Sequence, residues 1–231
     1  MGSVSVPLRP LLPPSVAVVE MWGDRRPRVL PDGAPWAPRV SPARLAEFAA
    51  GRWCAEQAMV DLGLQPLPVH VGEHREPLWP PGVVGSITHT GDYRGAAVAR
   101  SSDVAALGVD VERRHVLSPG VAELVLGPDE LGRLARGELD PDLAWLVVFS
   151  VKEAIFKAWF ARTRVWLDFL DVDLRLAHLH GSPGGTTGSF FVRPSAQRSD
   201  PGPLDLRHLK CRFALGPAVV ASVAYLEMPR R

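Results

Sequence analysis

Charged residues stand inside two short apolar stretches of this 231-residue chain. The first is Gly108-Val-Asp-Val-Glu112, where Asp110 and Glu112 would share one face of a strand because alternate side chains point the same way. Two adjacent carboxylates repel each other, and a hard divalent cation such as Mg²⁺ relieves that repulsion and can bridge to phosphate oxygens. The ordinary alternative is a strand with two solvent-facing acids, which is common.

The second stretch is Phe149-Ser-Val-Lys-Glu-Ala-Ile-Phe-Lys157, and it has neither Gly nor Pro and few polar residues, which predicts a buried helix. Glu153 and Lys157 share a face, whereas Lys152 lies about 100° round the helix from Glu153. A buried carboxylate needs a partner, because leaving water unpaired costs several kcal/mol. Two lysines beside one carboxylate indicate a site for a phosphate and a metal ion together. The alternative is an ordinary intrahelical Glu–Lys pair.

A third candidate is Gly85-Ser-Ile-Thr-His-Thr-Gly91, in which Thr88 and His89 stand at the end of a predicted strand. A hydroxyl and an imidazole in that place could hold a phosphate, although a histidine at a hairpin end is common without such a role. His70 and His74 have a spacing that would suit zinc on a helix. They lie among prolines with no obvious third ligand nearby, so zinc is not favoured.

The elements that must position these groups are predicted to form two similar halves. The first half contains a strand, a helix that begins at Ser41-Pro42, and three further strands, at 15–22, 41–62, 83–90, 93–99 and 106–112. The second half contains two helices and four strands, at 121–136, 142–160, 170–177, 189–193, 207–215 and 218–226. Short connections predict antiparallel meanders. We therefore expect an α+β chain with halves 1–116 and 117–231 and the site in the cleft between them.

The composition limits the classes of partner. Hydrophobic residues make up 46% of the chain, enough for a packed core, and 26 basic and 25 acidic residues leave a net charge of +1. That balance argues against a nucleic-acid-binding protein. Two cysteines fit a reducing compartment, and there is no run of about 18 apolar residues to predict a membrane span. The proline-broken N-terminus lacks the features of a signal peptide, so we expect a cytoplasmic protein, monomeric because two halves already form the cleft.

Taken in order, the motifs resemble those of the Sfp-type 4′-phosphopantetheinyl transferases, most closely the EntD-like and actinobacterial branch. The family motif G-[IV]-D-x-E is matched by residues 108–112, and [FW]-x-x-K-E-[AS]-x-x-K by residues 149–157. The continuation K-A-W-F-x-x-T-x-x-W-L-x-F is matched by 157–169 and E-P-x-W-P-x-G by 76–82. The pattern G-S-[IL]-T-H-x-x-G-Y is matched by 85–93, with its last glycine one residue earlier. The resemblance implies the pseudo-two-fold fold of that family.

The resemblance also implies an activity, that of a holo-[acyl-carrier-protein] synthase. Such an enzyme moves 4′-phosphopantetheine from coenzyme A to a serine of an apo acyl or peptidyl carrier protein and releases adenosine 3′,5′-bisphosphate. The carrier would serve fatty-acid, polyketide or nonribosomal-peptide synthesis. Asp110, Glu112 and Glu153 would hold Mg²⁺, with Mn²⁺ as an alternative.

The expected roles at the substrate follow from the same resemblance. The catalytic set is Glu153, Lys157 and His89, with Glu153 the better base and Lys157 the rival base or the cation on the bridging oxygen. The coenzyme A contacts are expected from Arg44, Arg52, His74, Arg75, Thr88, His89, Lys152 and Lys157. His74 or Arg75 would take the place of a loop lysine found in relatives, and Lys152 would neutralise a pyrophosphate oxygen.

Two other functions fit parts of the pattern. The chain could be a non-catalytic module that binds coenzyme A or a carrier protein, but all three acids and both lysines are present. It could be an Mg²⁺-dependent nucleotide phosphohydrolase, but the sequence has no identifiable water-positioning set and no P-loop. The carrier is expected to dock after Gly120 on the helix 121–136, where Leu124, Val125 and Leu131 are candidate contacts, although core packing would explain them equally well.

Overall fold

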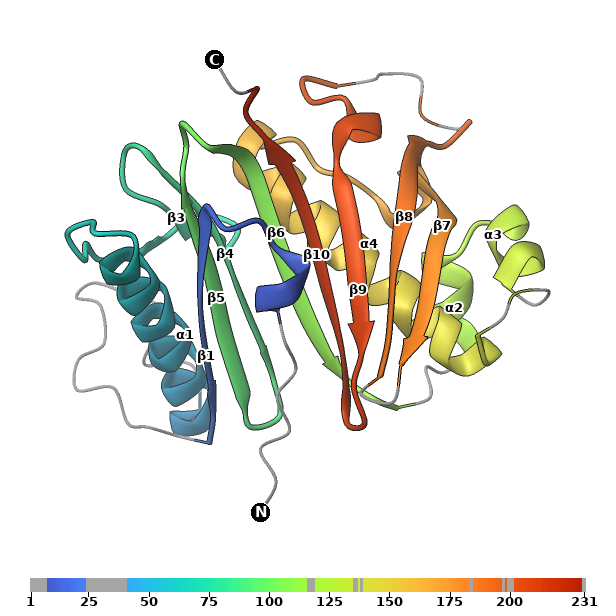
Figure 1. Ribbon diagram of the computed structural model, residues 1–231, viewed down its shortest axis with the longest axis horizontal. Coiled ribbons are helices and arrows are strands. Elements are labelled where there is room, and N and C mark those ends of the chain that lie inside the picture. The colour runs from blue at the N-terminus through green and yellow to red at the C-terminus, as the bar shows by residue number, and fades with distance from the viewer. Residues whose placement is uncertain are drawn as a thin grey trace.

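Two antiparallel sheets carry the fold in the computed structural model (Figure 1). The structure describes residues 8–23, 41–115, 119–134, 137, 139–182, 185–196, 198 and 202–229. The three-stranded sheet has the order β1–β5–β4, with bounds Val16–Trp22, Tyr93–Arg100 and Val83–Thr90. The five-stranded sheet has the order β6–β10–β9–β8–β7, with bounds Val104–Arg113, Val219–Glu227, Lys210–Leu215, Gly185–Pro194 and Val172–Ser182. A small pair, β2 (His70–Val71) and β3 (Pro77–Leu78), lies beside the first sheet.

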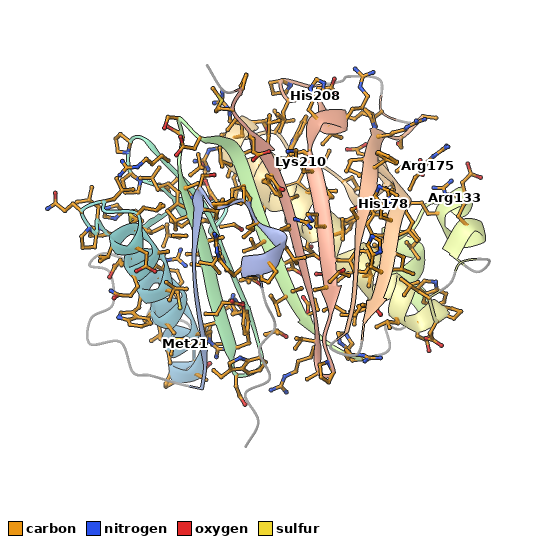
Figure 2. The ribbon with its side chains drawn as sticks, viewed as in Figure 1. Met21, Arg133, Arg175, His178, His208 and Lys210 are labelled. Carbon is orange, nitrogen blue, oxygen red and sulfur yellow. The ribbon has the colours of Figure 1, made fainter. Side chains whose placement is uncertain are left out.

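One long helix packs on each large sheet. The first, α1 (Pro42–Asp61), contacts β1, β4 and β5, and the second, α4 (Pro141–Thr163), contacts β6, β9 and β10 and passes behind the five-stranded sheet in Figure 1. In Figure 2 the exposed side chains of Arg175 and His178 project from β7, and α4 lies on the other side of the sheet. The mixed helix and antiparallel-sheet class expected from the sequence is confirmed. Among the described residues, no helix has the length and apolar character needed to cross a membrane.

Helix ends follow the local chemistry. The hydroxyl of Ser41 accepts a hydrogen bond from the Arg44 amide at 3.3 Å and Pro42 follows it, which fixes the start of α1. The single helix expected over 121–136 is instead two helices, α2 (Pro119–Val125) and α3 (Pro128–Leu134). Pro128 cannot donate an interior helical hydrogen bond, so the chain stops and restarts there.

Strand β6 was expected to form a meander with β4 and β5, but it belongs to the five-stranded sheet. It pairs along its length with β10, and Asp110 stands opposite Ser222 in that register. Gly108 explains the packing, because a Cβ at this position would lie 1.9 Å from the Ala154 carbonyl oxygen of α4. The strand that carries the acid pair is therefore pressed directly against the helix that carries Glu153.

The two sheets meet along β4 and β6 without a backbone ladder between them. The amide of Val109 donates instead to the hydroxyl of Ser86, and the amide of Val111 donates to the hydroxyl of Thr88, each at 3.0 Å. Three short 3-10 helices, η1 (Arg9–Leu11), η3 (Phe169–Asp171) and η4 (Leu206–His208), complete the described elements. Leu11 of η1 joins the core between the sheets. This seam places the end of β4 beside the acidic strand.

Candidate active site

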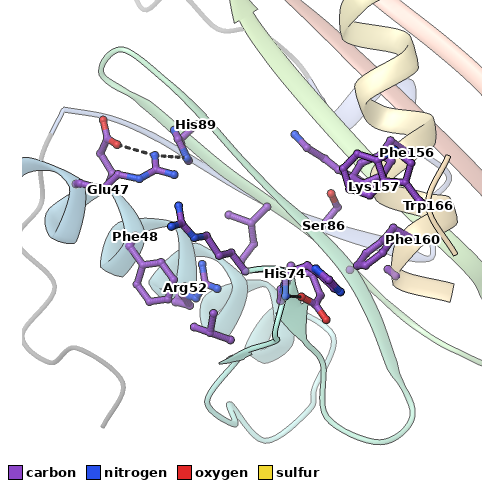
Figure 3. Close-up of a pocket in the computed structure, with 18 residues that line it drawn as sticks. Glu47, Phe48, Arg52, His74, Ser86, His89, Phe156, Lys157, Phe160 and Trp166 are labelled. Carbon is purple, nitrogen blue, oxygen red and sulfur yellow. Dashed lines mark hydrogen bonds and ion pairs between the residues drawn. The ribbon is translucent and has the colours of Figure 1, made fainter. Parts of the chain in front are cut away.

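A pocket of about 360 Å³ lies between the first helix and the C-terminal part of α4 (Figure 3). Its wall comes from α1, the loop between β2 and β3, β4, α4 and the segment after α4. Its lining includes the charged, imidazole and aromatic side chains of Arg44, Arg52, His74, Arg75, His89, Phe156, Lys157, Phe160 and Trp166. Six of the residues expected to bind the substrate therefore line one pocket, although they come from four elements: α1, the β2–β3 loop, β4 and α4.

The side of the pocket formed by α1 carries guanidinium groups. Arg52 is 7% exposed, and its Nε and Nη2 atoms have no hydrogen-bond partner among the described residues. Its guanidinium lies over the ring of Phe48 at 3.4 Å, and burial, helped by the charge of Arg44, lowers the pKa of Arg52 to about 10. A buried cation with unused donors is costly, so this wall is suited to an anionic ligand.

Arg44 connects α1 to the end of β4. Its Nη1 atom lies 3.1 Å from Glu47 Oε2 and 2.9 Å from His89 Nε2, and Figure 3 shows both contacts as dashed lines. Arginine has donors only, so His89 Nε2 is the acceptor and the imidazole is neutral. Burial lowers the pKa of His89 to about 4, with Arg44 acting in the same direction. His89 therefore contributes a neutral imidazole to the pocket at physiological pH.

The loop between β2 and β3 supplies another part of the wall. Arg75 adopts a left-handed backbone with φ of 67°, and the amide of His74 donates to Glu76 Oε2 at 2.9 Å. The His74 ring meets Phe160 edge to face, with centroids 5.6 Å apart. Glu76 also pairs with Arg164 at the end of α4. These contacts hold His74 and Arg75 on the pocket wall.

An acid cluster lies where β6 meets α4. Asp110 is 3% exposed and accepts from Lys157 Nζ at 2.6 Å and from Ser150 Oγ at 2.9 Å. Burial and the charges of Asp110 and Glu153 raise the pKa of Glu112 to about 7, against the opposing effect of Lys157. Burial likewise raises the pKa of Glu153, with Asp110 acting in the same direction and Lys157 against it. The cluster therefore holds more negative charge than its one lysine neutralises.

The same acids favour the charged form of Lys157. Burial alone would lower the pKa of its ammonium group, but Asp110, Glu153 and Glu112 outweigh burial and raise it above the ordinary value. Lys157 Nζ also donates to the Val109 carbonyl at 3.2 Å. The ammonium therefore stays charged and holds Asp110 in place.

The donor set of the cluster fits a hard divalent cation, because Asp110, Glu112 and Glu153 offer carboxylate oxygens, and burial together with the charges of neighbouring acids raises the pKa of Glu112 and of Glu153. Within the described part of the chain, no three acidic, histidine or cysteine side chains already converge as a metal site. The carboxylates would have to draw together around a cation. The three carboxylates thus suit a divalent cation in chemistry and charge, although their side chains do not converge on one point in this structure.

Two predicted contacts are wrong, and the first is Lys152. Its side chain is buried at 2% exposure and its Nζ donates to Glu130 Oε2 at 2.7 Å, to the Val125 carbonyl at 2.8 Å and to the Phe169 carbonyl at 2.9 Å. An ammonium group has three donors, and all three are used inside the protein. Lys152 is not part of the pocket wall and does not face the place expected for pyrophosphate.

Thr88 is the second correction. It is 2% exposed and lies outside the pocket lining, and its hydroxyl accepts from the Val111 amide across the seam. Alternation along β4 explains the difference, because Thr88 and His89 must point to opposite faces. The sequence treated the two neighbours as one phosphate grip, which the strand geometry does not allow.

Sequence reasoning missed an aromatic side of the pocket. Phe156 and Phe160 stack with ring centroids 5.5 Å apart, and Trp166 meets Phe156 edge to face at 5.0 Å. Trp166 is 67% exposed, which is unusual for so large an apolar side chain. The signal was present in the spacing of Phe156 and Phe160, which are four residues apart and so share one face of the helix. Ser150, the hydrogen-bond partner of Asp110, was also missed.

Comparison with known proteins places these features in a family. Residues 36–99 match the sequence model of the 4′-phosphopantetheinyl transferase N-terminal domain, and residues 106–196 match that of the 4′-phosphopantetheinyl transferase superfamily. The chain is 37% identical over 203 residues to the 4′-phosphopantetheinyl transferase Svp of Streptomyces mobaraensis, covering 87% of this chain and 80% of that protein.

Two further relatives agree. The chain is 39% identical over 165 residues to the 4′-phosphopantetheinyl transferase PptT of Mycobacterium tuberculosis, covering 71% of each protein. It is 34% identical over 122 residues to enterobactin synthase component D of Salmonella typhi, covering 52% of this chain and 50% of that protein. The two family matches, the length of these alignments and the shared motifs together show that this chain belongs to the 4′-phosphopantetheinyl transferase superfamily.

Proposed function

We propose that this member of the family transfers 4′-phosphopantetheine from coenzyme A to a serine of an apo acyl or peptidyl carrier protein, with Mg²⁺ as the metal. The observation that supports this most directly is a pair of opposite charge excesses linked by Lys157, which lines the pocket and donates to Asp110. Arg52 offers unused donors for an anion, and the cluster around Asp110 carries uncompensated acid for a cation. A metal-bound pyrophosphate with a further phosphate would satisfy both.

The anionic end of coenzyme A is assigned to the wall formed by α1 and the β2–β3 loop. Arg52 would bind through Nε and Nη2, and Arg44 could exchange its contact with His89 for a phosphate oxygen. Arg75 and His74 would stand in for the loop lysine of relatives. The stacked rings of Phe156 and Phe160 offer an apolar surface for the less polar parts of the substrate.

The reacting end is assigned to α4 and β6. The carrier serine oxygen attacks the phosphorus that bears the pantetheine arm, and the bond from that phosphorus to the bridging oxygen breaks. The serine proton passes to Glu153, directly or through a water, and adenosine 3′,5′-bisphosphate leaves with the bridging oxygen.

Lys157 remains protonated, so it serves better as the cation near the bridging oxygen than as the base. When bound, the divalent cation would neutralise charge on the pyrophosphate, held by Asp110, Glu112 and Glu153.

The carrier protein is assigned to the surface of α2. Leu124 is 69% exposed and Val121 is 36% exposed, so this short helix presents apolar side chains to solvent. Val125 belongs to the core at 2% exposure and is withdrawn as a contact, and the side chain of Leu131 lies outside the described residues. The apolar face of α2 would meet the carrier beside the acid cluster.

We also propose a pseudo-two-fold relation between the two halves, a monomeric protein and a cytoplasmic location. Each half pairs one long helix with an antiparallel sheet, which supports a pseudo-two-fold relation between 1–116 and 117–231, although β6 belongs to the second sheet. The pocket draws its wall from both halves of one chain, which supports a monomer. The two cysteines are free and buried, in keeping with a cytoplasmic location.

Intact-mass spectrometry of carrier proteins tests the function. The purified protein is incubated with coenzyme A, Mg²⁺ and a panel of apo acyl and peptidyl carrier proteins, with a chelator-treated reaction as control. We expect one carrier class to gain a single phosphopantetheine, and the chelated reaction to give none; the carrier that gains it decides the assignment as holo-[acyl-carrier-protein] synthase. Hydrolysis of coenzyme A without any carrier, or tight coenzyme A binding with no transfer to any carrier, would contradict the proposal.

A further inference from the structure

Lys152 and Glu130 form a buried ion pair that lies apart from the pocket. The ammonium group of Lys152 uses its three donors on Glu130, Val125 and Phe169, and the exposures of the two charged residues are 2% and 4%. Such a pair is kept only where its remaining hydrogen-bonding capacity is satisfied.

Glu130 satisfies that condition from the other side. Its Oε1 atom accepts from the Leu174 amide at 2.8 Å, and its Oε2 atom accepts from the Gly127 amide at 3.0 Å as well as from Lys152. The carboxylate therefore has two backbone donors and one ammonium donor. Removing either charged partner would leave the other buried with an unmatched charge.

The backbone atoms held by this pair come from separate elements. Val125 ends α2, Gly127 lies in the turn to α3, Phe169 belongs to η3 and Leu174 belongs to β7, while Lys152 itself projects from α4. The helices α2 and α3 have seven residues each, too few to be stable without tertiary contacts. The hydrogen bonds of the pair thus connect the α2–α3 segment to α4, the helix that carries Glu153.

We propose that Lys152 and Glu130 are positioning residues for the carrier protein, which set the place of α2 relative to α4 and do not contact coenzyme A. The proposal rests on the carrier-transfer function and on docking at α2. It assigns the two lysines of α4 to different steps. Lys157 faces the substrate pocket, and Lys152 faces the segment that presents Leu124.

Steady-state kinetics with one apo carrier protein, together with calorimetric binding of coenzyme A, separates these roles. We expect Lys152→Met to raise the carrier KM about tenfold, the size of a positional coupling, because α2 is no longer fixed. The coenzyme A Kd should stay within about twofold, since the pocket is separate from the pair. Lys157→Met is the matched control on the same helix, and it should weaken coenzyme A binding.

A second pair of variants keeps the test decisive if Lys152→Met does not fold. Lys152→Gln retains donors for the two carbonyl groups, and Glu130→Gln retains the shape of the acceptor while removing its charge. Both should show the same separation of carrier KM from coenzyme A Kd, and circular dichroism confirms their fold. A coenzyme A Kd weakened by Lys152 variants as strongly as by Lys157→Met would overturn the proposal and restore Lys152 as a phosphate ligand.

The docking assumption is tested separately with Leu124→Ser, which changes an exposed side chain outside the ion pair. A raised carrier KM for Leu124→Ser with no change for the Lys152 and Glu130 variants would reject the positioning role and keep docking at α2. An unchanged carrier KM for Leu124→Ser would reject docking at α2, and the positioning role with it. Absence of transfer by the wild-type protein to any carrier would instead reject the proposed function.

Discussion

The two charged regions of the site are opposite in kind. On the α1 side, Arg52 has donors that find no partner among the described residues, whereas on the α4 side the carboxylates outnumber their ammonium partner. In a site built only for stability, each excess would be matched by a neighbour. Each region lacks what a metal-bound polyphosphate carries, so the contrast indicates a ligand that bears both charges.

The regions also differ in how they are held. On α1, Arg52 lies over the ring of Phe48 and Arg44 contacts the imidazole of His89. Asp110, by contrast, accepts hydrogen bonds from both Ser150 and Lys157. The acid side is thus preorganised around one carboxylate, and the basic side has donors that can turn toward a ligand.

The largest effect is expected from Glu153→Ala, which removes the proposed base and one proposed metal ligand together. Transfer should fall by at least about a thousandfold, since the losses of acid–base and metal catalysis combine. Asp142→Ala, an exposed acid on the same helix, is the control and should retain activity. Carrier mass spectrometry and circular dichroism measure transfer and fold, and near-wild-type turnover by a folded Glu153→Ala would refute the assignment.

Arg52→Met tests the basic side of the pocket. Coenzyme A binding should weaken by about 30-fold, as expected for loss of a charge-assisted hydrogen bond. The ligand-free protein should gain stability on the order of 1 kcal/mol, because a buried group with unused donors has been removed. Calorimetry and urea unfolding measure the two effects. Arg207→Met, a surface arginine paired with Asp205, should change neither, and a less stable apo Arg52→Met with unchanged binding would contradict the contrast.

Glu112 tests the acid side through pH. The pKa of Glu112 is raised to about 7 in the folded protein from 4.5, so the folded state holds the proton more tightly than the unfolded state. Its contribution to stability is therefore present below pH 4.5 and is lost as pH rises through about 7, a change on the order of 1–2 kcal/mol once solvent screening of this half-buried group has reduced the full value of about 3 kcal/mol.

Urea unfolding at several pH values should show that Glu112→Gln removes this slope and stabilises the metal-free protein at pH 8. Mg²⁺ should stabilise the wild-type protein more at pH 8 than at pH 5. An equal slope in the variant would show that Glu112 does not carry the excess charge.

Ser150→Ala gives the smallest expected effect. The variant removes one hydrogen bond to Asp110, and the Mg²⁺ concentration for half-maximal stabilisation should rise about tenfold, the low end of the effect seen when a group that orients a metal ligand is removed. Ser222→Ala is a matched control, because Ser222 is also buried, stands opposite Asp110, and has a hydroxyl without a partner among the described residues. Thermal unfolding across an Mg²⁺ titration checks both, and equal shifts in the two variants would remove Ser150 from this role.

The sequence predicted the elements better than their relations. The N-cap residue Ser41 and the following Pro42 predicted the start of α1, because helix capping is a local effect. The strand that carries Asp110 and Glu112 was also predicted, because the alternation of side chains along a strand is local too. The sequence did not predict that β6 would join the second sheet. The need for glycine at position 108 becomes visible only once α4 is known to pack against β6. The pairing of Lys152 with Glu130 was hidden for the same reason, since a lysine beside a motif glutamate has no local mark of its distant partner.

The seam between β4 and β6 has a mechanical consequence. Its rungs are the hydroxyls of Ser86 and Thr88, which turn about a single side-chain bond, whereas the rungs inside each sheet are parts of a planar backbone. Separation of the two sheets along this seam therefore breaks side-chain hydrogen bonds and apolar contacts, but no backbone ladder. Hydrogen exchange at the amides of Val109 and Val111 would report this separation, because these two protons are released to solvent when β6 moves away from β4.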